Sequence, residues 1–240
     1  MTTHDRTDFP FLRALLASAT PVVMEVKQRD AHGHDLLGGR TPAAVVSAYE
    51  DAGAPCVSVV TGRWFGGSKA LLREVATLTR LPLLQKDFIT RAEQIAQARE
   101  LGASAVLLTA ALLPVSSLSK LVDRCLLTGL TPFVEITTEA ELEAVPHASE
   151  CVIAVNNKDI RTRERDTGDL GRSTALLPAL RATGTPCPVS ASGIDGPTTA
   201  ARLLDAGFGG LLVATSLLRA GSPARWLDEV RGARRGLALR

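Results

Sequence analysis

The sequence predicts a single-domain (β/α)₈ barrel, an α/β fold in which eight parallel strands alternate with helices. Eight short segments rich in Val, Ile and Leu occur along the chain, and a segment with helical spacing follows each of them. Continuous apolar runs are typical of parallel strands that are buried on both faces. The 240 residues are close to the ~250 that such a barrel typically has. We therefore expect one domain over residues 1–240, with the barrel itself over about 20–232.

The strands are expected at the apolar segments, where β-branched side chains favour extended backbone. Each segment has four or five residues, a length that suits a strand better than a helix. The expected strands are residues 22–26, 56–60, 82–85, 105–109, 131–135, 151–155, 187–190 and 211–214.

The helices are expected between the strands, where apolar residues recur at three- and four-residue spacing. Thr41 and Pro42 are suitable N-cap and first-turn residues. Gly102 and Gly207 are typical residues at the end of a helix. The expected helices are residues 42–52, 68–79, 91–101, 116–127, 139–145, 172–181, 197–206 and 223–232, with a short extra helix that begins near 215.

An open, doubly wound sheet is the alternative α/β arrangement. Such a sheet usually has a G-x-G-x-x-G loop after its first strand, and the sequence contains no such motif. Eight units in one series, with no linker or low-complexity tract, favour the closed barrel.

The composition excludes several classes of protein. A formal net charge of +2 is too small to suggest nucleic-acid binding, and no apolar run has the length of a membrane span. The four cysteines form no CxxC pair and suit a reducing compartment, so we expect a cytoplasmic protein. The N-terminal segment MTTHDRTDFPF is polar, so we expect no signal peptide. His32 and His34 have no clear third ligand, so we expect no metal.

Charged and polar side chains lie at the carboxyl ends of several expected strands, where barrels of this type carry their active sites. They are Glu25 and Lys27 at the end of the first strand, Lys86 after the third, Glu135 at the end of the fifth and Asn156 directly after the sixth. Glu25 and Lys27 are two residues apart and so share one side of the strand. The functional interpretation is a cluster of general acids and bases. The alternative is that Glu25–Lys86 and Glu135–Lys27 are structural ion pairs in the barrel mouth.

A phosphate site is expected after the last two strands, where such barrels often bind this group. Ser192 and Gly193 follow the seventh strand, and Ala214 and Thr215 follow the eighth and open a short helix. The alternative is an ordinary helix N-cap. The predicted partner is therefore a phosphorylated small-molecule substrate.

Several blocks of sequence can be compared with known families. They are MEVK (24–27), SVVTGRWFGGS (58–68), LLQKDFIT (83–90), GASAVLLTAALL (102–113), FVEITTEAEL (133–142), IAVNNKDI (153–160), SASGI (190–194) and LLVATSLL (211–218). With these blocks in this order, the chain resembles the indole-3-glycerol phosphate synthase family from about residue 11 to residue 218.

The resemblance implies a ring closure on 1-(2-carboxyphenylamino)-1-deoxyribulose 5-phosphate, with loss of carbon dioxide and water. It implies that Lys86 is the general acid, and that Glu135 is the base or the stabiliser of positive charge on the anilino nitrogen. By the same resemblance Lys27 holds the substrate carboxylate, Glu25 orients Lys27, and Asn156 binds substrate hydroxyls.

The resemblance also implies a substrate-binding shell without a metal or organic cofactor, in a monomer or weak homo-oligomer. The residues implied to line the slot for the aromatic ring are Phe65, Phe88, Leu108 and Ile160. Lys158, Ser192, Gly193, Ala214 and Thr215 are implied to bind the rest of the substrate.

The chain departs from the family pattern at four places. Residues 28–34 replace the family's S-P-S-K-G loop, and there Asp30 disfavours an anion whereas Arg29, His32 or His34 favour one. Ala191 stands in place of a Glu. Ala214 stands where a glycine usually lies close to phosphate. About 20 residues precede the first strand, so the family's N-terminal helix over the mouth is expected to be shortened or absent.

These departures leave two alternatives to the synthase. One is a paralogous enzyme of specialised metabolism that uses the same acid/base core on a modified substrate. The other is a non-catalytic barrel that binds a phosphorylated ligand, and the presence of both lysines and of Glu135 argues against it.

Overall fold

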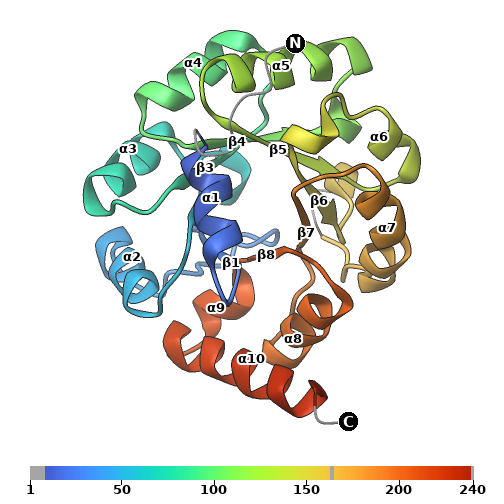
Figure 1. Ribbon diagram of the computed structural model, residues 1–240. Coiled ribbons are helices and arrows are strands. Elements are labelled where there is room, and N and C mark those ends of the chain that lie inside the picture. The colour runs from blue at the N-terminus through green and yellow to red at the C-terminus, as the bar shows by residue number, and fades with distance from the viewer. Residues whose placement is uncertain (1–8, 163–164, 239–240) are drawn as a thin grey trace.

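The computed structural model describes residues 9–162 and 165–238. Eight parallel strands form a closed barrel in chain order, with β1 paired to both β2 and β8 (Figure 1). The strands are β1 Val22–Val26, β2 Val57–Val60, β3 Leu83–Lys86, β4 Ala105–Thr109, β5 Thr131–Ile136, β6 Val152–Asn156, β7 Cys187–Ala191 and β8 Gly210–Val213. This topology confirms the (β/α)₈ barrel and excludes the open doubly wound sheet.

The helices form a ring outside the barrel, with α1 as the exception (Figure 1). The α-helices are α1 Pro10–Ala17, α2 Pro42–Asp51, α3 Lys69–Leu78, α4 Ala92–Glu100, α5 Val115–Leu127, α6 Glu139–Glu143, α7 Leu170–Ala182, α8 Pro197–Ala206, α9 Thr215–Arg219 and α10 Pro223–Ala238. Short 3₁₀ helices are η2 Arg63–Phe65, η3 Ala110–Leu112, η4 Ala148–Glu150 and η5 Ile160–Thr162.

Helix α10 continues past the predicted end at residue 232. Arg231 Nε donates a hydrogen bond to Thr20 Oγ1 at 3.1 Å, and Arg234 Nε contacts Asp205 Oδ1 at 2.9 Å. These contacts attach the basic segment to the loop before β1 and to α8, so tertiary contacts outweigh the low helix propensity of the glycines there.

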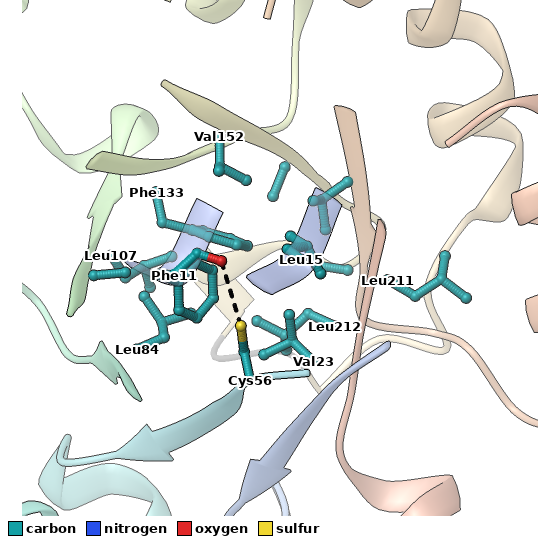
Figure 2. Packing of buried hydrophobic residues seen from close by; sticks show 14 of the residues in the cluster. Phe11, Leu15, Val23, Cys56, Leu84, Leu107, Phe133, Val152, Leu211 and Leu212 are labelled. Carbon is teal, nitrogen blue, oxygen red and sulfur yellow. Dashed lines mark hydrogen bonds between the residues drawn. The ribbon is translucent and has the colours of Figure 1, made fainter. Parts of the chain in front are cut away.

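Helix α1, which the sequence analysis did not predict, crosses the amino end of the barrel. Its Phe11 and Leu15 are fully buried among residues at the starts of the strands (Figure 2). Phe11 packs edge-to-face on Phe133, with ring centroids 6.1 Å apart, and the Cys56 thiol donates to the Phe11 carbonyl oxygen at 3.4 Å. The described N-terminal helix therefore closes the end of the barrel opposite to the mouth.

The interior is filled almost entirely by aliphatic side chains. Every residue of β1 to β6 and β8 is buried, as expected for strands covered on both faces. The four cysteines are buried and unpaired, and burial raises the pKa of Cys125 and of Cys187 to about 12. These thiols serve as small apolar side chains. No helix within the described ranges is both long and apolar enough to cross a membrane.

Candidate functional site

A cavity of about 640 Å³ opens at the carboxyl ends of the strands. Eight of the residues predicted for the site line it: Glu25, Lys27, Lys86, Lys158, Ser192, Gly193, Ala214 and Thr215. A small recess adjoins the cavity, and Lys86 lines both. The recess holds four other predicted residues: Phe65, Phe88, Glu135 and Ile160. Loops and strand ends from most of the chain thus converge on one site.

Lys86 and Glu25 form a buried charged pair at the bottom of the mouth. Lys86 Nζ lies 4.0 Å from Glu25 Oε2, and the two side chains are 9% and 2% exposed. Ser58 Oγ donates to the same carboxylate oxygen at 3.0 Å, and Tyr49 Oη donates to the Glu25 carbonyl oxygen at 2.9 Å. Glu25 is therefore fixed by β2 and α2, and its charge attracts the Lys86 ammonium.

Lys27 connects the cavity with the recess. Its Nζ lies 3.9 Å from the centroid of the Phe65 ring, within the range of a cation–π interaction. Glu25 and Lys27 both line the cavity, as their spacing of two predicted. Glu135 of β5 is 2% exposed and lines the recess beside Lys86. Acidic and basic groups thus border a slot whose walls carry aromatic rings.

Leu108, predicted for the slot, lines neither hollow. Leu107 and Thr109 of the same strand line the recess instead. Successive side chains of a strand point to opposite faces, so Leu108 faces away and is fully buried in the core. The prediction for Leu108 is therefore wrong by one position along β4.

Asn156 and Asn157, at the end of β6, make different hydrogen bonds. Asn156 is fully buried, its Oδ1 accepts from the Lys158 backbone N–H at 2.9 Å, and its Nδ2 has no hydrogen-bond partner among the described residues. Asn156 itself lines neither the cavity nor the recess. Asn157 Nδ2 donates to Ser190 Oγ, Ala191 O and Ser192 O, each at 3.0 Å. Asn157 thereby fixes the end of β7, a structural role that the sequence pattern does not reveal.

The turn after β7 has an unusual backbone conformation. Ser192 has φ of 64° and Gly193 has φ of 70°. A positive φ is unfavourable for a residue with a side chain, and such strain occurs preferentially at functional sites. The neighbouring Ser216 of α9 lines the cavity, and its Oγ is buried without a partner in the described part of the chain. The cavity therefore ends in polar groups from the β7 and β8 loops.

The loop between β1 and α2 brings Asp30, His32 and His34 to the cavity. Arg29 and Asp35 form an antiparallel bridge, and Asp30 is buried at the base of this hairpin, where it contacts Arg219 of α9. No local sequence pattern marks Arg219 as a site residue. Within the described ranges, no group of three or more His, Cys, Asp or Glu side chains could hold a metal ion.

Comparisons with known proteins agree over nearly the whole chain. A family model described as "Indole-3-glycerol phosphate synthase" matches residues 3–230. The protein of that name from Pyrococcus furiosus is 38% identical over 217 residues, which cover 89% of this chain and 92% of that protein. The one from Aquifex aeolicus is 32% identical over 231 residues, covering 95% of this chain and 88% of that protein.

A solved structure also matches the barrel. The crystal structure of 3-hexulose-6-phosphate synthase from Salmonella typhimurium covers 90% of this chain, and this chain covers 98% of it. The TM-score is 0.67 at 12% sequence identity, so this likeness concerns the fold alone.

Proposed function

Because the chain belongs to the indole-3-glycerol phosphate synthase family, we propose that it converts 1-(2-carboxyphenylamino)-1-deoxyribulose 5-phosphate to indole-3-glycerol phosphate. Members of this family are carboxy-lyases of tryptophan biosynthesis, and this chain is such a lyase. The observation that carries the proposal is the position of Lys86, which is paired with Glu25 and borders both the polar cavity and the recess with Glu135.

The shape of the two hollows supports one orientation of the substrate. The aromatic ring enters the recess between Phe65, Phe88 and Ile160, where its apolar faces are removed from water. The phosphate lies at the far end of the cavity, near Ser192 and Thr215. The reacting ketone then lies at the junction of the hollows, which is where Lys86 is found.

The charged groups supply the proton transfers. Lys86 donates a proton to the ketone oxygen as the ring attacks the carbonyl carbon, and water leaves later from this position. Glu135 accepts a proton or stabilises the positive charge on the anilino nitrogen. Carbon dioxide leaves from the ring carbon that carries the carboxylate, and this carboxylate is held by Lys27.

Two further residues have supporting roles in the proposal. Glu25 lies 4.0 Å from Lys86, so we assign it to the positioning of Lys86 in preference to Lys27. Asn156 Nδ2, a buried donor without a partner among the described residues, binds a substrate hydroxyl. The proposed steps use side chains only.

A paralogous enzyme with a modified substrate is the second candidate. It is favoured by the loop of Asp30, His32 and His34, which lines the cavity with residues foreign to the family pattern, and by Ala191 in place of a Glu. Substitution Ala191→Glu distinguishes the two. The substitution should raise indole-forming activity if the chain is a synthase that has diverged in sequence. It should not raise this activity if the enzyme is adapted to another substrate.

A fluorescence assay for indole formation tests the proposal. We expect turnover by the wild-type protein, and loss of at least a hundredfold in kcat for Lys86→Ala and for Glu135→Gln, as is typical for a lost general acid or base (~10²–10⁴-fold). The control is Lys120→Ala, because Lys120 is exposed on α5. Full activity in either site variant, or a folded wild-type protein without turnover, contradicts the proposal.

A further inference from the structure

The β1–α2 loop is attached to helix α9 at two places. Arg219 Nη2 donates to Asp30 Oδ2 at 3.1 Å, and Arg40 Nη2 donates to the Leu218 carbonyl oxygen at 2.6 Å. The first contact joins residues 189 positions apart in the chain. The loop is thus held against the polar end of the cavity that α9 borders.

Asp30 is fully occupied by contacts within the protein. Its Oδ1 accepts from the backbone N–H groups of His32 and His34 at 2.9 and 3.0 Å. Its Oδ2 accepts from Arg219 and lies 3.0 Å from His34 Nδ1. The Asp30 side chain is 11% exposed, and a guanidinium balances its charge. The sequence suggested that Asp30 would disfavour an anion, but this pairing removes the repulsion.

Arg219 retains most of its donors for a ligand. A guanidinium has five N–H donors, and within the described ranges its one hydrogen-bond partner is Asp30. The side chain is 61% exposed and lines the cavity. Ser216, one helical turn earlier and therefore on the same face of α9, adds a buried hydroxyl without a partner in the described chain. These two groups form one cationic, donor-rich wall.

We propose that Arg219, oriented by Asp30, binds the substrate phosphate and determines specificity for it, with Asp30 as the positioning residue. The proposal rests on the proposed function in one respect, namely that the substrate carries a phosphate. A guanidinium held on one edge by a carboxylate can present its other edge to two phosphate oxygens. His32 and His34 of the loop also line this cavity.

The first test is the binding of inorganic phosphate, measured by calorimetry in the absence of substrate. Arg219→Gln is expected to raise the dissociation constant for phosphate about tenfold, which is typical of losing one hydrogen bond to a charged group. Arg225→Gln is the matched control, because Arg225 is an exposed arginine on α10 that pairs with Glu229. An unchanged affinity in Arg219→Gln, or no phosphate binding by the wild-type protein, overturns the proposal.

The positioning role of Asp30 is tested by a double-mutant cycle. Asp30→Asn is expected to weaken phosphate binding in the wild-type background and to have little further effect in the Arg219→Gln background. If the two losses add in full, Asp30 acts on the loop structure alone and its positioning role is contradicted. Circular dichroism at the assay temperature shows whether each variant is folded.

Steady-state kinetics separates this inference from the proposed function. With active enzyme, Arg219→Gln should raise KM for the phosphorylated substrate by a larger factor than it lowers kcat. Phosphate binding that depends on Arg219 in a protein without indole-forming activity contradicts the proposed function and supports the inference. Normal turnover together with an unchanged KM in Arg219→Gln contradicts the inference alone.

Discussion

In the proposed reaction, Glu25 acts indirectly, through Lys86. It contacts Lys86 at 4.0 Å and accepts a hydrogen bond from Ser58. Glu25→Gln keeps the size of the side chain and removes the charge that attracts the ammonium. We expect kcat to fall about tenfold or more, since small displacements of a catalytic group are costly, with a smaller change in KM. Glu229→Gln, on the outer face of α10, is the control. Equal kinetics for the two variants would exclude a positioning role for Glu25.

Asp30 gives a prediction for stability as a function of pH. Burial raises the pKa of this carboxyl, but the hydrogen bonds from His34 and His32 outweigh it and lower the pKa from 3.8 to about 2. Asp30 therefore stabilises the fold above pH 3.8, and this stabilisation is lost as the pH falls through about 2.

The expected consequence is that Asp30→Asn lowers the free energy of unfolding by about 1–3 kcal/mol at pH 7. Urea unfolding at several pH values measures the difference from wild type, which should shrink as the pH falls below about 4. A difference that is constant with pH would show that the charge of Asp30 is not the cause.

Single site residues were predictable from the sequence to different degrees. Lys27, Lys86 and Glu135 stand out because charged residues seldom occur at the ends of apolar strands unless they have a task or a partner. Leu108 was placed on the wrong face, since a continuous apolar run has no alternation that marks which side chains face the site. The contact of Asp30 with Arg219 spans 189 positions, and local patterns carry no information about it.

At the scale of elements, helix α1 stabilises the fold and lies at the end of the barrel opposite to the site. Leu15 is fully buried at the amino end of the barrel, whereas the adjacent Leu16 is 47% exposed. Leu15→Ala should lower the free energy of unfolding by about 2–5 kcal/mol, and Leu16→Ala should have a much smaller effect. Denaturant unfolding measures both. Similar losses in the two variants would contradict the packing of α1 against the barrel.

The loop from β2 to α3 passes close to β2 at Gly67. A Cβ on Gly67 would overlap the Val60 carbonyl oxygen, so Gly67→Ala must displace the loop that carries Phe65. We expect a loss of about 1–3 kcal/mol in unfolding free energy and a higher KM, because the wall of the recess moves. At Gly221 an added Cβ meets no atom within 4 Å, and Gly221→Ala is the control. Wild-type KM in Gly67→Ala would contradict the role of this loop.

Most elements were predictable because strand and helix signals alternate with different periods. Helix α1 was missed although Phe11, Leu12 and Leu15 have helical spacing, since eight residues are a weak periodic signal. The end of α10 was placed too early because its glycines suggested a stop, whereas Arg231 and Arg234 attach it to distant elements.

At the scale of the whole molecule, the two ends of the barrel have separate tasks. The amino end is closed by α1 and apolar side chains, and the carboxyl end holds the charged cavity. Conservative substitutions at the amino end should therefore alter stability more than turnover. Conservative substitutions at the carboxyl end should alter turnover more than stability. The closed barrel itself was predictable, because eight alternating units in one series leave few other topologies.

The most direct test of the central claim is to measure carbon dioxide release and indole formation together, from 1-(2-carboxyphenylamino)-1-deoxyribulose 5-phosphate. We predict one carbon dioxide for each indole with the wild-type protein, and rates of both products at least a hundredfold lower with Glu135→Gln. Carbon dioxide without indole, or no product from folded wild-type protein, would contradict this claim.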